Sequence, residues 1–159
     1  MSCFVKRTAF FILLASLLLG CNQPSSPVFK EEIVGLKLVR LITGEDALLA
    51  INKLHGQEID VVSGVIACYQ GEKEKATIWL SESPSENDAI QQTADMVRKM
   101  RDSKKTPFSN YAEIDRSGMK IYSFMGLGQQ HYIFRVKTSI YWISANPGTI
   151  DKVWEGLVK

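Results

Sequence analysis

Histidines and carboxylates are the side chains of this chain that could do acid–base chemistry, and they are few and dispersed. The 159 residues include only two histidines, His55 and His131, so a metal site built from several histidines is excluded. Paired acids about 5–10 Å apart could do glycosidase-type work. The acidic residues that flank the expected strands are Glu58, Asp60, Glu113 and Asp115. The sequence does not show that they converge, and solvated strand ends are the simpler interpretation.

Motifs for cofactors are equally sparse. The stretch GLGQQH, residues 126–131, has two of the three glycines of a dinucleotide fingerprint, but it leads into a strand instead of a helix. A hairpin turn is the better interpretation, with the glycines supplying positive φ. The chain has neither Cys-x-x-Cys nor Gly-x-Ser-x-Gly. We therefore expect no cofactor and no metal, and we assign no catalytic residue.

Aromatic residues are concentrated between residues 122 and 142, which is the one unusual feature of the composition. Most of them should belong to the core. Some must lie on the sheet surface opposite the helices, where polar and aromatic side chains together could bind a ligand or a partner. The candidates for this surface are Tyr122, His131, Tyr132, Arg135 and Tyr141. A sheet with both faces partly covered is the alternative.

Three helices are expected among the elements that position these residues. Apolar residues at helical spacing follow Thr43 in GEDALLAINKLHG. The clearest helix is expected over residues 83–102, with Ser83 as its cap and Pro84 in its first position. A last helix, with apolar residues again at helical spacing, is expected to start at Asn146-Pro147.

About seven strands are expected, because β-branched and aromatic residues dominate the segments between short turns. They span residues 34–42, 60–70, 75–81, 111–115, 119–125, 130–136 and 139–144. Adjacent strands joined by short turns pair antiparallel, which predicts an α+β domain with helices packed on one sheet face. Alternation then places His131, Ile133 and Arg135 on one face, and the residues between them on the other.

Two segments of the chain resemble each other. IWLSESP, residues 78–84, matches YWISANP, residues 141–147, and the same offset of 63 superposes Tyr69 on Tyr132. A duplicated strand–strand–helix unit would produce this pattern. Convergence is the alternative, because a strand that leads into a helix with a proline near its start is common.

The N-terminal segment has the composition of a secretory signal. Lys6 and Arg7 precede a run from residue 9 to 19 that is apolar except for Ser16. A membrane-spanning helix needs about 20 such residues, whereas a signal needs about 7–15. The run ends in Leu18-Leu19-Gly20-Cys21.

These four residues resemble the lipobox of bacterial lipoproteins. The resemblance implies that a signal peptidase recognises Leu18, Leu19 and Gly20 and cleaves before Cys21. It also implies a diacylglycerol thioether on the Cys21 sulfur, with a fatty acyl chain such as palmitate on the new amino group. Asn22 is not the aspartate of inner-membrane retention, so the outer membrane facing the periplasm is favoured if the cell has two membranes. An ordinary secretory signal that contains a cysteine is the alternative.

Removal of residues 1–20 changes the charge and the cysteine count. The full chain has 19 basic and 17 acidic residues, and the signal takes away two basic residues and no acidic one. The mature chain is formally neutral, so nucleic acid is not an expected partner. Cys3 leaves with the signal and Cys21 would carry lipid, so Cys68 remains as a single thiol without a disulfide partner. In an apolar strand, Cys68 is expected to be a small buried hydrophobe.

The domain organisation follows from these observations. Residues 1–20 are the expected signal peptide, residues 21–32 the lipidated cysteine with a flexible tether, and residues 33–159 a single α+β domain. We expect a lipid-anchored cell-envelope protein whose domain binds a ligand or partner, or scaffolds an envelope complex, and does no catalysis. An envelope hydrolase that uses acidic residues with His131 is the alternative.

Overall fold

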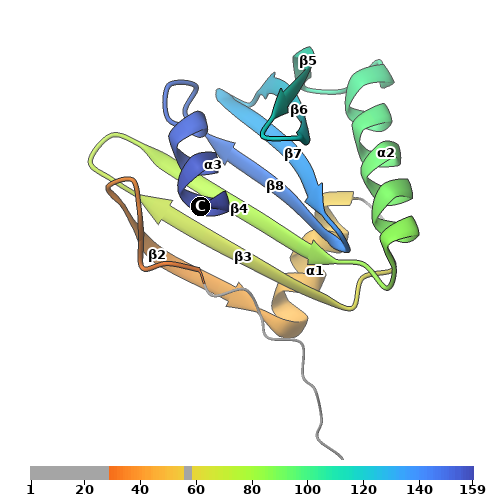
Figure 1. Ribbon diagram of the computed structural model, residues 1–159, viewed down its shortest axis with the longest axis horizontal. Coiled ribbons are helices and arrows are strands. Elements are labelled where there is room, and N and C mark those ends of the chain that lie inside the picture. The colour runs from red at the N-terminus through yellow and green to blue at the C-terminus, as the bar shows by residue number, and fades with distance from the viewer. Residues whose placement is uncertain (1–28, 56–58) are drawn as a thin grey trace, which may run out of the picture.

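The computed structural model describes residues 29–55 and 59–159, and these form eight strands and three helices (Figure 1). The α+β class and the antiparallel sheet are confirmed, and the strand that the sequence did not indicate is the two-residue β1. In chain order the elements are β1 (Glu32–Ile33), β2 (Leu36–Thr43), α1 (Gly44–His55), β3 (Ser63–Gln70), β4 (Lys75–Glu82), α2 (Glu86–Asp102), β5 (Phe108–Arg116), β6 (Met119–Gly126), β7 (Gln129–Val136), β8 (Ser139–Ala145) and α3 (Ile150–Val158).

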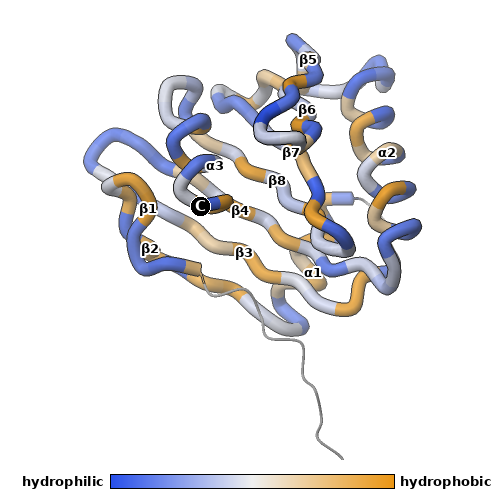
Figure 2. The backbone as a smooth tube through the Cα atoms, viewed as in Figure 1, coloured by the Kyte–Doolittle hydropathy of each residue, from blue (hydrophilic) through white to orange (hydrophobic). Residues whose placement is uncertain are grey.

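The strands form one sheet in the order β1-β2-β3-β4-β8-β7-β6-β5, with antiparallel neighbours throughout. Strands β4 and β8 meet in the centre, where Trp79 lies directly opposite Trp142. The expected turn between residues 126 and 129 is a hairpin: Leu127 and Gly128 both have positive φ, at 52° and 74°. Figure 2 shows that hydrophobic residues follow the central strands, whereas the turn between β3 and β4 is hydrophilic.

Helices cover both faces of the sheet, which corrects the expectation that all of them pack on one face. Ile133 and Ile140 pack with buried residues of α2. Gly64 pairs with Ser81, which in turn pairs with Ile140, so these three residues share one face of the sheet. A Cβ on Gly64 would lie 2.5 Å from the Ile51 side chain of α1, so α1 covers that same face. We call it the two-helix face. Helix α3 lies on the opposite face, in front of the sheet in Figure 1, and we call that the α3 face.

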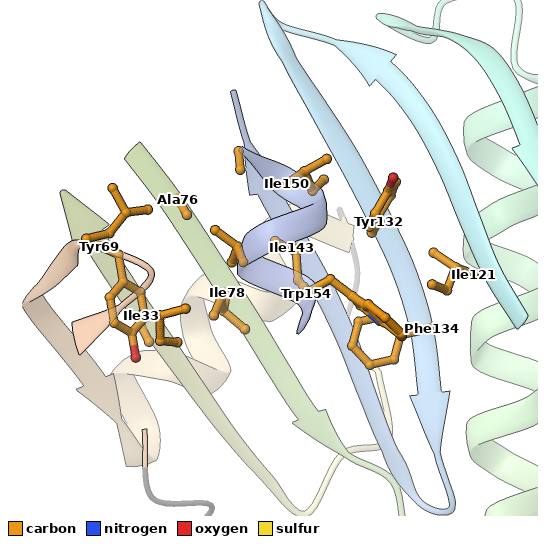
Figure 3. Close-up of a cluster of buried hydrophobic side chains, with 14 residues drawn as sticks. Ile33, Tyr69, Ala76, Ile78, Ile121, Tyr132, Phe134, Ile143, Ile150 and Trp154 are labelled. Atoms are coloured by element: carbon orange, nitrogen blue, oxygen red, sulfur yellow. The ribbon is translucent and has the colours of Figure 1, made fainter. Parts of the chain in front are cut away.

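The reason for this arrangement is the composition of the central strands. Strands β7 and β8 carry large apolar side chains at successive positions, so both of their faces need cover. On the α3 face, Trp154 contacts Phe134 edge-on, with ring centroids 6.5 Å apart, and Ile143 is fully buried (Figure 3). The expected alternation of residues 131–136 between the two faces is confirmed.

Two helix starts differ from expectation. The N-cap of α2 is Ser85, whose hydroxyl accepts from the Asp88 amide at 3.2 Å, because Ser83 is buried and donates to the Gln92 side chain. Helix α3 begins at Ile150, three residues beyond Pro147, with a turn between them. The predicted signal peptide and Cys21 lie outside the described residues.

The last residues of the expected tether contact the domain. Glu32 and Ile33 form β1 against β2, and Phe29 packs against the core of the α3 face. The Lys30 carbonyl accepts from the Tyr69 hydroxyl at 2.9 Å. The Lys30 ammonium donates to the Gly156 carbonyl of α3 at 3.0 Å.

Candidate functional site

The five residues of the expected ligand surface lie on opposite faces of the sheet. Tyr122, His131 and Arg135 are on the two-helix face, and Tyr132 and Tyr141 are on the α3 face. His131 and Tyr132 are each only 2% exposed. The structure therefore brings these five side chains into no single surface.

His131 is held by three hydrogen bonds inside the core. Its Nε2 lies 2.9 Å from the Gly126 carbonyl, which can only accept, so Nε2 carries the hydrogen. Its Nδ1 accepts from the Trp142 indole at 3.1 Å and from the Ser144 hydroxyl at 2.8 Å. Both ring nitrogens are thus satisfied in the neutral form, and burial lowers the pKa of His131.

Aromatic rings enclose His131 on the two-helix face. The Phe108 ring contacts it edge-on, with centroids 5.1 Å apart, and the Trp142 ring lies 5.9 Å away. Phe108 can approach this closely because residue 126 is glycine, where a Cβ would lie 2.5 Å from Phe108 Cδ1. The surroundings of His131 are those of a structural core histidine.

Tyr132 and Tyr141 have structural partners on the α3 face. The Tyr132 hydroxyl donates to Asp151 at 2.5 Å, and burial together with this carboxylate raises the pKa of Tyr132 to about 12. Arg116 forms an ion pair with Asp151 at 2.7 Å and lies over the Tyr132 ring. Tyr141 stacks on Phe134 with centroids 4.9 Å apart.

The acidic residues that the sequence marked do not converge in the part of the chain that the structure describes. Glu113 accepts from Tyr111 at 2.6 Å and from Lys120 at 2.9 Å on edge strand β5, where Asp115 is also exposed. Asp60 lies before β3, and Glu58 is outside the described residues. Among the residues described, no three histidines, cysteines or acids are grouped as metal ligands.

A pocket lies between α1 and α2, above β4 and β8 on the two-helix face. Its volume is about 100 Å³. Apolar side chains from both helices, both strands and the segment before β3 form most of its wall: Ile51, Leu54, Ile59, Trp79, Met96, Ile140 and Trp142. Its polar lining comprises His55, Ser81, Gln92, Asp95 and Lys99. An apolar concavity with a few polar groups is the usual form of a small-molecule site.

The polar groups of the pocket differ in how far they are already paired. Gln92 accepts from Ser83 at 3.0 Å and donates to the Asp60 carbonyl at 2.7 Å. Asp95 forms an ion pair with Arg98 at 2.7 Å and accepts from Gln91. His55 and Lys99 form no side-chain hydrogen bond or ion pair with any described residue. Burial, and next the positive charge of Lys99, lower the pKa of His55.

A second, broader groove lies between α2 and strands β6 and β7, with a volume of about 490 Å³. It brings together two of the five expected residues, Tyr122 and Arg135. Arg135 is paired there with Glu86 at 3.1 Å. The groove is more open than the pocket, and Lys120 and the Ser117-Gly118 turn form part of its rim. The pocket between α1 and α2 is therefore the better candidate site.

Sequence reasoning missed this pocket, although it did mark one part of it. The internal resemblance aligned Trp79 with Trp142, and the structure places both indoles in the pocket wall. Gln92, Met96 and Lys99 also follow one another at i, i+4 and i+7 on α2, and Met96 is one of the buried residues of that helix. That spacing indicates one helix face but not what the face meets.

The comparisons with known proteins identify no relative. No family model, no curated protein and no solved structure matches the chain. Within residues 29–55 and 59–159, no helix combines the length and the apolar character that a membrane crossing requires.

Proposed function

We propose that this chain is a lipid-anchored cell-envelope lipoprotein whose α+β domain binds a ligand or an envelope partner. The lipobox-like Leu18-Leu19-Gly20-Cys21 supports the anchor, and with Asn22 it favours the outer membrane in a cell with two membranes. Two or more acyl chains give stable membrane attachment, at about 0.8 kcal/mol for each buried methylene.

The pocket between α1 and α2 is the observation that carries the binding role. It joins apolar walls from four elements with a cation and an imidazole that have no partner among the described residues. Packed cores seldom contain cavities larger than a water molecule, so an opening of about 100 Å³ flanked by two indoles is a site that a ligand group can fill.

The hydrolase alternative gains no support from the geometry. It requires a carboxylate near His131, and the hydrogen-bond partners of that ring are Gly126, Trp142 and Ser144. Glu113 lies on edge strand β5, engaged with Tyr111 and Lys120.

The anchor is tested by replacing Cys21. The Cys21→Ser variant should lose incorporation of labelled fatty acid and leave the membrane fraction, because serine cannot form the thioether. The Cys68→Ser variant is the matched control, since Cys68 lies in β3, and it should stay labelled and membrane-bound. A Cys21→Ser protein that still partitions with lipid would refute the anchoring.

The binding role is tested by blocking the pocket. Leu54 is 43% exposed at its rim, so Leu54→Trp should fill the opening, whereas Leu49 is 61% exposed on the same helix and does not line the pocket. Wild-type protein and the Leu49→Trp control should retain the same envelope components after solubilisation, and Leu54→Trp should lose them. If wild-type protein, Leu49→Trp and Leu54→Trp retained the same components equally well, the pocket would have no role in binding.

We also propose that the hairpins β3–β4 and β7–β8 arose by duplication. In support, Trp79 and Trp142 are matched by the offset of 63 and are also register partners across β4 and β8. The helices that follow the two hairpins lie on opposite faces, so any duplication extends to the hairpins and not to the placement of the helices. Convergence remains the alternative.

A further inference from the structure

We propose that the pocket between α1 and α2 binds a small monoanion: a carboxylate attached to one apolar ring or one branched apolar group. This inference rests on the binding role proposed above and names the chemical class of its ligand. Three properties of the pocket lead to it: its size, its apolar wall and the charge at its mouth.

The size limits the apolar part of the ligand. An apolar cavity of about 150 Å³ accepts a benzene molecule. The pocket has about 100 Å³ and is open to solvent on one side. One ring or one branched side chain can enter with its polar end at the mouth, whereas a long acyl chain has no room.

The wall favours a ring. Trp79 and Trp142 come from adjacent strands as a cross-strand pair, and both are half-buried. The Trp142 indole N–H is already bonded to His131, so its carbon atoms are what remains for a ligand. Aromatic groups add about 0.5–1.5 kcal/mol to such contacts beyond the burial of area. Ile140 and Met96 supply the rest of the apolar contact.

The charge at the mouth favours an anion. Asp95, the carboxylate of the lining, is neutralised by Arg98 at 2.7 Å. Gln92 has its oxygen and its nitrogen engaged by Ser83 and Asp60. The donors without a side-chain partner among the described residues are therefore those of Lys99, His55 and Ser81, and Lys99 is the one that carries a positive charge.

The positive charge of Lys99 influences the other side chains that line the pocket, as the pKa of His55 shows. Its positive charge is one of the two causes that lower the pKa of His55 on the facing helix, and burial is the larger cause. An ammonium that disfavours a second positive charge at this position stabilises a negative one there by the same Coulomb term. A ligand carboxylate between Lys99 and His55 would accept hydrogen bonds from both side chains, which have no other partner among the described residues.

The experiment compares three ligands of one shape and different charge: phenylacetate, phenylacetamide and phenethylamine. Each is titrated into the full-length protein in detergent, and the indole N–H resonances of Trp79 and Trp142 report binding by NMR. Phenylacetate should bind about tenfold more tightly than the amide, as expected for one charge-assisted hydrogen bond. Phenethylamine should bind most weakly.

Two variants connect that preference to its source. Lys99→Gln should weaken phenylacetate about tenfold and leave the amide unchanged. Lys104→Gln, which alters an exposed cation beyond the end of α2, should change neither affinity. Comparison between variants in the same detergent also cancels any partitioning of the ligands into micelles.

The outcomes separate this inference from the role on which it rests. Equal affinity for phenylacetate and the amide, or a preference for phenylacetate that persists in Lys99→Gln, would refute the proposal that the ligand is a monoanion. The proposal that the pocket binds a ligand would still stand. Absence of an indole shift with all three ligands would overturn the binding role as well.

Discussion

At the scale of single residues, the clearest result is that His131 is structural. A histidine beside aromatic residues in a strand is a natural candidate for a binding surface. In the fold, the ring donates to the Gly126 carbonyl and accepts from Trp142 and Ser144, and it is almost fully buried. Each of these partners comes from a neighbouring strand, so alternation alone could assign the face of His131 but not its bonds.

Protonation of His131 should destabilise the fold. A second ring hydrogen on Nδ1 would face the Trp142 N–H, so the buried ring stays neutral and its pKa is lowered by burial. The unfolded chain binds a proton at about pH 6.5, the ordinary pKa of histidine, whereas the folded ring binds one only at lower pH. The contribution of His131 to the free energy of unfolding should therefore be constant above about pH 7, and it should be lost as the pH falls from there to the folded-state pKa.

Urea denaturation at several pH values between about 8 and 5 checks this expectation. The pKa of His55 is lowered as well, so the His55→Gln variant serves as the control. The pH dependence that remains in this variant between about pH 8 and 6 belongs to His131, because the carboxylates with lowered pKa values, such as Glu113 and Asp151, titrate below that range. A flat profile over that range in His55→Gln would contradict the neutral, buried ring.

At the scale of elements, the sequence located the helices well and their first residues less well. The segments that lead from a strand into α2 and into α3 each contain a proline, and these two helices begin at Glu86 and Ile150, two and three residues after it. Serine is a common N-cap residue, but the Ser83 side chain is buried and its hydroxyl donates to the Gln92 side chain. A tertiary contact thus decided which serine caps α2.

Loss of the Ser85 cap should destabilise the protein. Ser85→Ala removes the acceptor for the Asp88 amide, and we expect a loss of about 1 kcal/mol in the free energy of unfolding. Ser85→Thr keeps a hydroxyl in the same place and should change stability much less. Chemical denaturation of the two variants makes the comparison. Equal losses would show that the hydroxyl has no capping role.

At the scale of the whole molecule, α3 covers one face of the sheet and also contacts the first described residues of the chain. Trp154 packs edge-on against Phe134, and Arg116 from the β5 end lies over the Trp154 ring. The same helix receives the Lys30 ammonium at Gly156. Segments more than a hundred residues apart in the chain therefore meet on α3.

Removal of Trp154 should weaken that closure. Trp154→Ala should cost about 3–5 kcal/mol in the free energy of unfolding, because it leaves a cavity beside Phe134. The Trp154 indole nitrogen is buried without a hydrogen-bond partner among the described residues, so Trp154→Phe gives up no bond there. We expect Trp154→Phe to cost less than Trp154→Ala, because it keeps one aromatic ring beside Phe134 and leaves a smaller cavity. Similar losses for both variants, measured by denaturation, would contradict this account.

The docking of residues 29–32 also shortens the proposed tether. If Cys21 carries lipid, residues 22–28 are what separates it from the first residue that packs on the core, Phe29. At about 3.3–3.6 Å per residue, those seven residues reach roughly 25 Å. The proposed anchor would then hold the domain close to the membrane surface, with α3 on the tethered side.

The sequence by itself determined the local properties of this protein. Periodicity and turn residues predicted the helices, all of the longer strands and the Leu127-Gly128 hairpin, because these depend on interactions between neighbours in the chain. The α+β class and the alternation of residues 131–136 followed from the same short-range rules.

Only the tertiary structure decided how those elements meet. It placed helices on both faces, paired β4 with β8, buried His131 and Tyr132 on opposite sides and assembled the pocket from α1, α2, β4 and β8. Trp79 and Lys99 are twenty residues apart, and His55 is further still from Trp142. Contacts across such distances depend on which buried surfaces fit together in three dimensions, and no periodicity along one chain records that.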